Sequence, residues 1–169
     1  MKTIDYLVAS LPALVFDAPA PMTAEEFKAQ CEGVDYAHSP AWLDLETQLK
    51  NARAEMRQAA PKQESLGGSH VKLRPSGGCS LYWKSRVASC FQEKNPAERE
   101  KLLDRVWWDA AGELTSPIQP LGRGALETYA VRLAIALKRS RISTQAGNAV
   151  FDRLTASTAS NDGLQKEEV

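Results

Sequence analysis

Residues 95–115 read NPAEREKLLDRVWWDAAGELT, and this stretch is the clearest helix in the chain. Asn95 suits the N-cap because its side-chain oxygen can accept from a free N–H of the first turn, and Pro96 suits the first helical position because it has no N–H to leave unpaired. Apolar residues then recur at three- and four-residue steps and form one face: Leu103, Val106, Trp107, Ala110 and Leu114. A tryptophan buries about 150–250 Å². We therefore expect Trp107 to be the core anchor on which other helices pack.

Similar spacing, with caps, prolines and glycines at the ends, predicts the other helices of the chain. Pro12 interrupts the first one, so the N-terminal segment is either a short helix, which we favour, or an extended arm. The capping box of Thr23 and Glu26 opens the second. The predicted ranges are 4–11, 24–32, 40–59, 81–94, 125–140 and 145–156, and the apolar breadth of 125–140 makes it a central helix.

Residues 61–79 interrupt this pattern with two Gly-Gly pairs and two prolines, which predicts a long flexible loop. A chain of 169 residues is long enough for one domain with a proper core. We expect an all-α, single-domain bundle of about six helices over residues 1–156. The small polar residues of 157–169 predict a disordered tail.

Residues that could bind a phosphate or a metal, or act in catalysis, are present, but their spacing does not match that of such sites. The Gly-rich loop lacks the G-x-x-x-x-G-K-[ST] pattern that cradles phosphates. His38, His70 and the three cysteines lack the spacing of paired metal ligands. Cys31 and Cys90 fall at core-facing helical positions, where a cysteine is a small apolar side chain. We expect no catalytic, cofactor or metal site, and favour a binding or structural protein over an enzyme.

Charge is balanced over the chain but uneven along it. The formal net charge is zero, while residues 1–50 sum to −5 and residues 121–142 to +4. The two regions either face each other, face different partners or are ordinary solvated faces. A nucleic-acid surface is disfavoured, since it would need net positive charge and interleaved aromatic residues. The candidate partner-binding residues are Arg132, Lys138, Arg139 and Arg141, together with Lys72 and Arg74 of the loop.

Location is indicated by three features. The cysteines are odd in number and lack a C-x-x-C pair, which is typical of a reducing compartment. No apolar run approaches the ~20 residues of a membrane-spanning helix. Residues 18–20 read Ala-Pro-Ala, as at a signal cleavage site, but Asp5 and Pro12 disfavour a signal peptide. We expect a cytoplasmic protein.

Five stretches together resemble a known family. They are YLVASLP at 6–12, MTAEEF at 22–27 with Cys31, KLLD at 101–104 leading to Trp107, LETY at 126–129 through LAIA at 133–136, and GNAVF at 147–151. The chain resembles the uncharacterised helical family encoded in bacterial V-type (A-type) ATP synthase operons. That family is in turn similar to the socket subunit of these enzymes, which is designated by the letter C in bacteria and d in eukaryotes.

The resemblance implies a non-catalytic subunit or assembly factor that links the central stalk to the membrane ring and supports ATP-coupled ion transport. It implies no cofactor and no catalytic residue. Its partners would be the stalk and ring subunits, which would place the chain peripherally at the inner membrane. Two alternatives stay open: a stand-alone helical adaptor for another protein, and a small enzyme or nucleotide-binding domain built around the Gly-rich loop.

Overall fold

A computed structural model describes residues 3–59 and 73–141. All regular elements in these ranges are helical, apart from one isolated bridge between Ser116 and Gln119. The all-α prediction is therefore confirmed for this part of the chain. The elements are α1 (Ile4–Ser10), α2 (Ala24–Gln30), α3 (Pro40–Ala59), α4 (Leu81–Cys90), α5 (Pro96–Ala111), the 3₁₀ turn η1 (Gly112–Leu114) and α6 (Arg123–Arg141). The predicted helix 145–156, the tail 157–169 and loop residues 60–72 lie outside the described residues.

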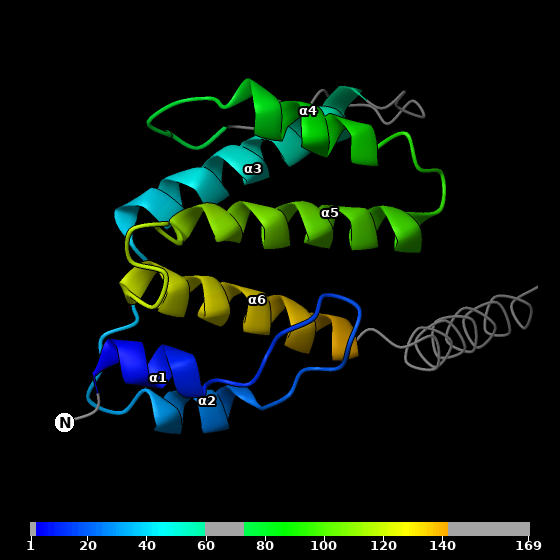
Figure 1. The fold of residues 1–169 in the computed structure, drawn as a ribbon. Helices are drawn as coiled ribbons and strands as arrows, with labels where there is room; N and C mark the ends of the chain where they lie inside the picture. Colours follow the sequence, from blue (N-terminus) through cyan, green and yellow to red (C-terminus); the bar gives the residue numbers. More distant parts are fainter. Residues whose placement is uncertain (1–2, 60–72, 142–169) are drawn as a thin grey trace, which may run out of the picture.

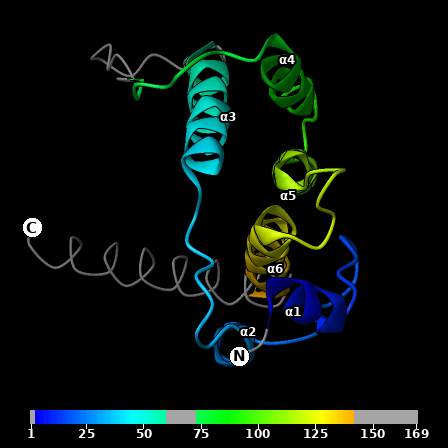
Figure 2. The same ribbon diagram turned by 60° about the vertical axis from the view of Figure 1, so that its left-hand side comes forward.

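The helices stack in a column (Figure 1). α4, α5 and α6 follow one another, α1 and α2 lie beyond α6, and α3 lies beside α4 and α5 (Figure 2). α4 and α5 lie side by side and antiparallel (Figure 1). Residues 31–39 run from α2 back to the start of α3 and pass alongside α6 (Figure 2). This connection, which we call the strap, runs beside α6 and links the N-terminal helices to α3.

Helix ends follow the capping residues of the sequence. The Ala97 N–H donates to Asn95 Oδ1 at 2.9 Å, and Thr23 and Glu26 form the predicted capping box. α4 ends at Cys90 rather than near Lys94. Asn95 caps α5 in an extended conformation, and a residue before proline disfavours the helical region. Residues 91–95 therefore form the turn between α4 and α5.

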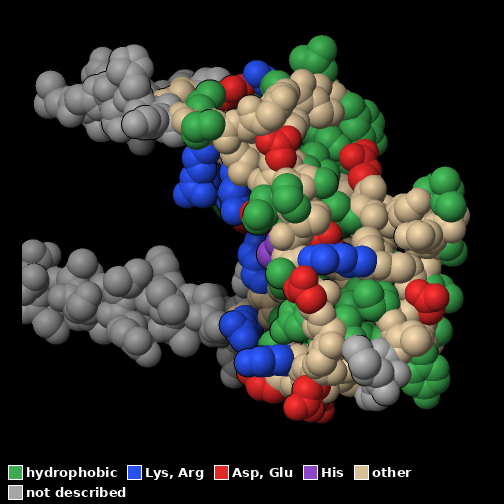
Figure 3. All heavy atoms as spheres, turned by 90° about the vertical axis from the view of Figure 1, so that its left-hand side faces the viewer, with side chains coloured by type: hydrophobic (Ala, Val, Ile, Leu, Met, Phe, Trp, Pro, Cys, Tyr) green, Lys and Arg blue, Asp and Glu red, His purple; other side chains and the backbone are tan. Residues whose placement is uncertain are grey.

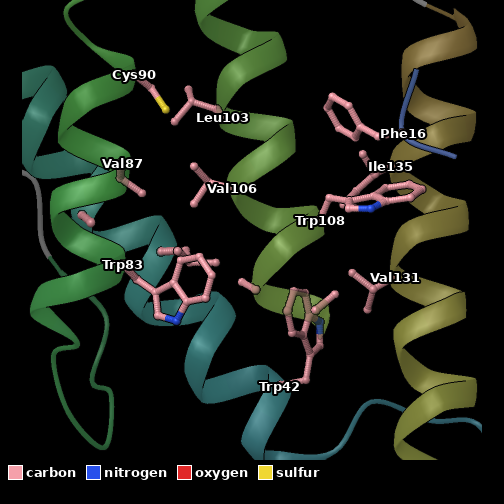
Figure 4. Packing of buried hydrophobic residues seen from close by; sticks show 14 of the residues in the cluster. Phe16, Trp42, Trp83, Val87, Cys90, Leu103, Val106, Trp108, Val131 and Ile135 are labelled. Carbon is pink, nitrogen blue, oxygen red and sulfur yellow. The ribbon is translucent and has the colours of Figure 1, made fainter. Parts of the chain in front are cut away.

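The larger core cluster lies between α3, α4, α5 and α6 and is built around three tryptophans (Figure 4). Trp42, Trp83 and Trp108 are all buried in it. Phe16, from the segment between α1 and α2, meets Trp108 edge-on at 5.4 Å between ring centroids. The predicted anchor was wrong: Trp108 is 6% exposed, whereas Trp107 is only partly buried. α5 is buried on two sides, and the apolar spacing identified only the side of Leu103, Val106 and Ala110, whereas Trp108 lies on the other side.

The second core cluster joins α1, α2 and α6. Its buried members are Leu7, Met22, Phe27, Cys31, Leu126 and Leu133. α6 also supplies Val131, Ile135 and Ala136 to the larger cluster. α6 therefore packs against helices on two sides, as predicted for a central helix.

Trp108→Ala should destabilise the fold by about 3–5 kcal/mol, as expected for removing a buried tryptophan. Trp107→Ala should cost clearly less, because part of that ring already meets solvent. Urea denaturation of both variants measures the difference. Equal losses would contradict the assignment of Trp108 as the anchor.

Candidate partner-binding groove

An apolar groove of about 510 Å³ lies between the strap, α2, α3, α5 and α6. Its size falls in the range of sites that take a ligand or a few side chains of a partner. Most lining residues are apolar, and three ionisable side chains, His38, Glu46 and Lys138, also line it. The apolar lining includes Phe27 of α2, Trp42 of α3, Trp107 of α5, and Ala130, Val131, Ala134 and Leu137 of α6.

Trp107 faces the groove because its neighbour faces the core. Successive residues of an α-helix point about 100° apart. Once Trp108 is buried against Phe16, Trp107 must point to another side of α5, and that side borders the groove. The tandem Trp-Trp was the signal in the sequence, since two adjacent indoles of one helix cannot both occupy the same core face.

α6 provides a wall of small residues. Ala130 and Ala134 are four positions apart and lie one above the other on the same helix face. Ala134 is exposed, and Leu137 and Lys138 continue this wall toward the helix end. Small side chains leave the helix backbone close to the groove surface, so an incoming helix can approach it closely.

The strap is held to α6 by a buried carboxylate. Glu127 is 3% exposed, and its Oε1 accepts a hydrogen bond from the Ser39 backbone N–H. His38 Nδ1 lies 3.7 Å from the same oxygen. Nearby, Arg123 Nη2 pairs with Asp35 Oδ2 at 3.1 Å. These contacts fix the wall of the groove that carries residues 36–38.

The four candidate partner-binding residues of α6 make different contacts. Lys138 Nζ pairs with Asp104 Oδ1 and borders the groove. Arg139 lies over the Phe16 ring at 4.0 Å and pairs with Asp17 at 3.1 Å. Arg132 lies over the Trp108 ring and donates to the Trp108 carbonyl oxygen. Of these four residues, the structure thus places only Lys138 at the groove.

The other predicted contacts lie elsewhere. Arg141 is exposed at the end of α6, Arg74 is exposed beside α3, and Lys72 lies outside the described residues. On the face shown in Figure 3, basic side chains occur in several groups with acidic and apolar side chains between them. Exposed apolar residues also occur away from the groove, including Leu81, Tyr82 and Ile118, the last of which is 91% exposed.

The acidic and basic regions of the chain do face each other in part. Asp17 pairs with both Lys101 and Arg139. The hydrogen bond from Lys101, aided by Arg139, holds the pKa of Asp17 below its usual value. These contacts tie the segment between α1 and α2 to α5 and α6.

The end of the Gly-rich segment is attached to α3. Asp44, Gln48 and Asn51 lie on one side of α3 and bond to the backbone of the passing chain. Asp44 accepts from the Gly77 N–H, and Gln48 from the Ser80 N–H at 2.9 Å. Asn51 both donates to and accepts from the backbone of Arg74. Residues 74–80 therefore extend along α3 and lead directly into α4.

Two of the cysteines belong to the core, as predicted. Cys31 and Cys90 are buried, and burial raises the pKa of both thiols, which keeps them protonated and unreactive at neutral pH. Cys79 is exposed. Within residues 3–59 and 73–141, no group of three or more His, Cys, Asp and Glu side chains is placed to hold a metal ion.

Comparison with known proteins yielded no relative: no family model, no curated protein and no solved structure matches this chain. Among the described residues, no helix is both long and apolar enough to cross a bilayer.

The Asp44–Gly77 contact predicts a pH effect. The hydrogen bond from the Gly77 N–H lowers the pKa of Asp44 below the usual aspartate value, so the stability it contributes is present at neutral pH and is lost as the pH falls through the folded-state pKa. In an NMR titration, the Gly77 amide shift should move with a midpoint below the usual aspartate value. Asp44→Asn should abolish the transition. A midpoint at or above the usual aspartate value would contradict the contact.

Glu127→Ala should destabilise the fold by about 1–3 kcal/mol, because the Ser39 N–H loses its buried acceptor. The matched control is Glu46→Ala. Glu46 pairs with Lys50 on the surface of α3, and such pairs contribute at most about 0.5 kcal/mol. Thermal or urea unfolding compares the two, and similar losses would show that Glu127 does not hold the strap.

Proposed function

We propose that this chain is a non-catalytic helical subunit or assembly factor of a bacterial V-type ATP synthase. In this proposal it binds an amphipathic helix of a central-stalk or membrane-ring subunit and thereby supports ATP-coupled ion transport from a peripheral, cytoplasmic position. The observation that carries the binding role is the groove between the strap, α3 and α6, whose lining is mostly apolar.

The groove has the features that a docked helix requires. Amphipathic helices bind through apolar anchors one turn apart, which enter pockets in a hydrophobic groove. Trp107 is partly exposed and offers ring surface for such an anchor, and tryptophan is enriched among residues that dominate binding energies.

The link to the ATP synthase rests on the family resemblance. The stretches that carry this resemblance include 6–12, 22–27 with Cys31, and 126–136. They contain all six buried residues of the second cluster: Leu7, Met22, Phe27, Cys31, Leu126 and Leu133. This cluster positions α2 and α6, which form two walls of the groove. The same residues that carry the resemblance therefore build the frame of the proposed binding surface.

A stand-alone adaptor is the alternative, since the same groove would serve a helix from another protein. Co-purification from the native organism separates the two. Under the V-type proposal, tagged protein brings down the nucleotide-binding head or central-stalk subunits of the ATPase. Tagged protein that never brings them down would remove the ATPase assignment and leave the adaptor role.

Ala134→Glu should abolish binding of the ATPase subunits, because it places a charge in the apolar wall. The fold should change by no more than about 0.5 kcal/mol, since Ala134 is exposed. Ser140→Glu is the matched control: it adds the same charge to an exposed position of α6 that does not line the groove. Quantified co-purification measures both. Full binding by Ala134→Glu would exclude this groove as the docking site.

A further inference from the structure

The groove keeps apolar surface open to solvent. Trp107 and Leu137 are only partly buried and Ala134 is exposed, and all three line the groove. The space between its walls is not filled by any of the described residues. Apolar surface left open in this way marks a site of contact with an apolar partner.

The charged side chains that line the groove already have partners inside the fold. Glu46 pairs with Lys50 at 2.8 Å, and Lys138 pairs with Asp104. Such ion pairs contribute little to stability, but they leave no unbalanced charge for an occupant to meet. The groove therefore suits a segment that brings apolar side chains and little net charge.

The groove lies next to the point where the described part of the chain ends. Leu137 and Lys138 of its lining belong to the last turns of α6, which ends at Arg141. Leu137 is about 6 Å from that end along the helix axis. Residues 142–169 follow directly and lie outside the described residues. A further stretch of the same chain thus begins about one helical turn from the groove.

The sequence of this stretch contains a segment that fits the groove. Residues 145–156 read QAGNAVFDRLTA and have the spacing of an amphipathic helix. In a helix, Val150, Phe151 and Leu154 would fall within an arc of about 100°. Asp152 and Arg153 would fall outside that arc, and their charges cancel. The segment offers one apolar face and no net charge.

The distances along the helix axes also match. With residues 142–144 as the connection, which is within the about 2–5 residues of helix hairpins, the segment would run back along α6. Val150 and Leu154 would then lie about 7.5 and 13.5 Å from its start. Leu137 and Ala130 lie about 6 and 16.5 Å from the end of α6. The apolar side chains of the segment would therefore lie level with the groove lining of α6.

Covalent linkage favours this segment over a free ligand. A helix shorter than about 12–15 residues is marginal alone in water, and Gly147 weakens this one further. Such a helix needs a surface on which to pack. A short link gives the segment an effective concentration on the order of millimolar at a nearby site. Weak apolar contacts are then enough for it to occupy the groove.

We propose that residues 145–156 form a helix antiparallel to α6 and place Val150, Phe151 and Leu154 in the groove of their own chain. The inference rests on the docking role that the proposed function gives to the groove, and it adds regulation. A partner helix would have to displace this segment before it binds. The segment is thus an internal competitor that keeps the apolar groove covered when no partner is present.

NMR spectra of the full chain test the contact without any partner. Nuclear Overhauser effects should join the Phe151 ring to the methyl groups of Ala134 or Leu137. Phe151→Ser combined with Leu154→Ser should remove them and shift the amide signals of both groove residues. Leu164→Ser is the matched control, because it makes the same change outside the predicted helix. Groove signals that keep their wild-type positions in the double variant would overturn the proposal.

The groove side gives the reciprocal test. Ala134→Glu should release the segment, and the Cα shifts of residues 150–154 should then move toward random-coil values, since the free helix is marginal. Ser140→Glu adds the same charge at an exposed position outside the lining and should leave those shifts unchanged. Random-coil shifts in the wild type, or helical shifts that persist in Ala134→Glu, would each contradict docking in this groove.

A second copy of the chain is the other occupant to separate. Isotope-labelled double variant is mixed with unlabelled wild-type protein, and the amide signals of Ala134 and Leu137 are followed. If the segment docks within its own chain, these signals stay at their variant positions. Their return to the wild-type positions would show docking between molecules and overturn the proposal. No ATPase subunit is present, so the outcome is independent of the co-purification that tests the proposed function.

Discussion

The burial of α6 on several sides is the constraint on which the rest of the structure depends. Leu126 and Leu133 pack against α1 and α2, while Val131 and Ile135 pack against the tryptophan cluster. Neither cluster would be closed without this helix. A further side of α6 borders the groove. One helix thus supplies the shared wall of both hydrophobic clusters and of the groove.

Much of the helical architecture was predictable because its signals are local. Caps such as Asn95 and Thr23 act within one helical turn, so their sequence patterns predict where α5 and α2 begin. Local sequence does not determine which of Trp107 and Trp108 is buried in the core. That depends on where Phe16 packs, and Phe16 comes from a segment far away in the sequence. Apolar periodicity predicts that α5 has a buried face, but not which of two adjacent indoles forms its centre.

The candidate site was less predictable than the fold. The groove draws residues from α2, the strap, α3, α5 and α6, and no single stretch of sequence contains its pattern. Because the basic residues near the end of α6 are close together in the sequence, we expected them to form a single surface. In the structure they diverge, because Arg139 turns toward Phe16 and Asp17 while Lys138 turns toward Asp104. Tertiary packing determines which residues these basic side chains contact, and the sequence of the helix itself does not show them.

The long-range contacts of the N-terminal segments have a consequence for how the chain folds. The Ser39–Glu127 hydrogen bond joins residues 88 positions apart, and the Asp17–Arg139 pair spans 122 positions. α1 and α2 are too short to be stable alone, and the helix that covers them is made much later during synthesis. Contacts that close such long loops form slowly. On the ribosome, the α3–α4–α5 unit can therefore assemble first, while the N-terminal helices wait for α6 to emerge.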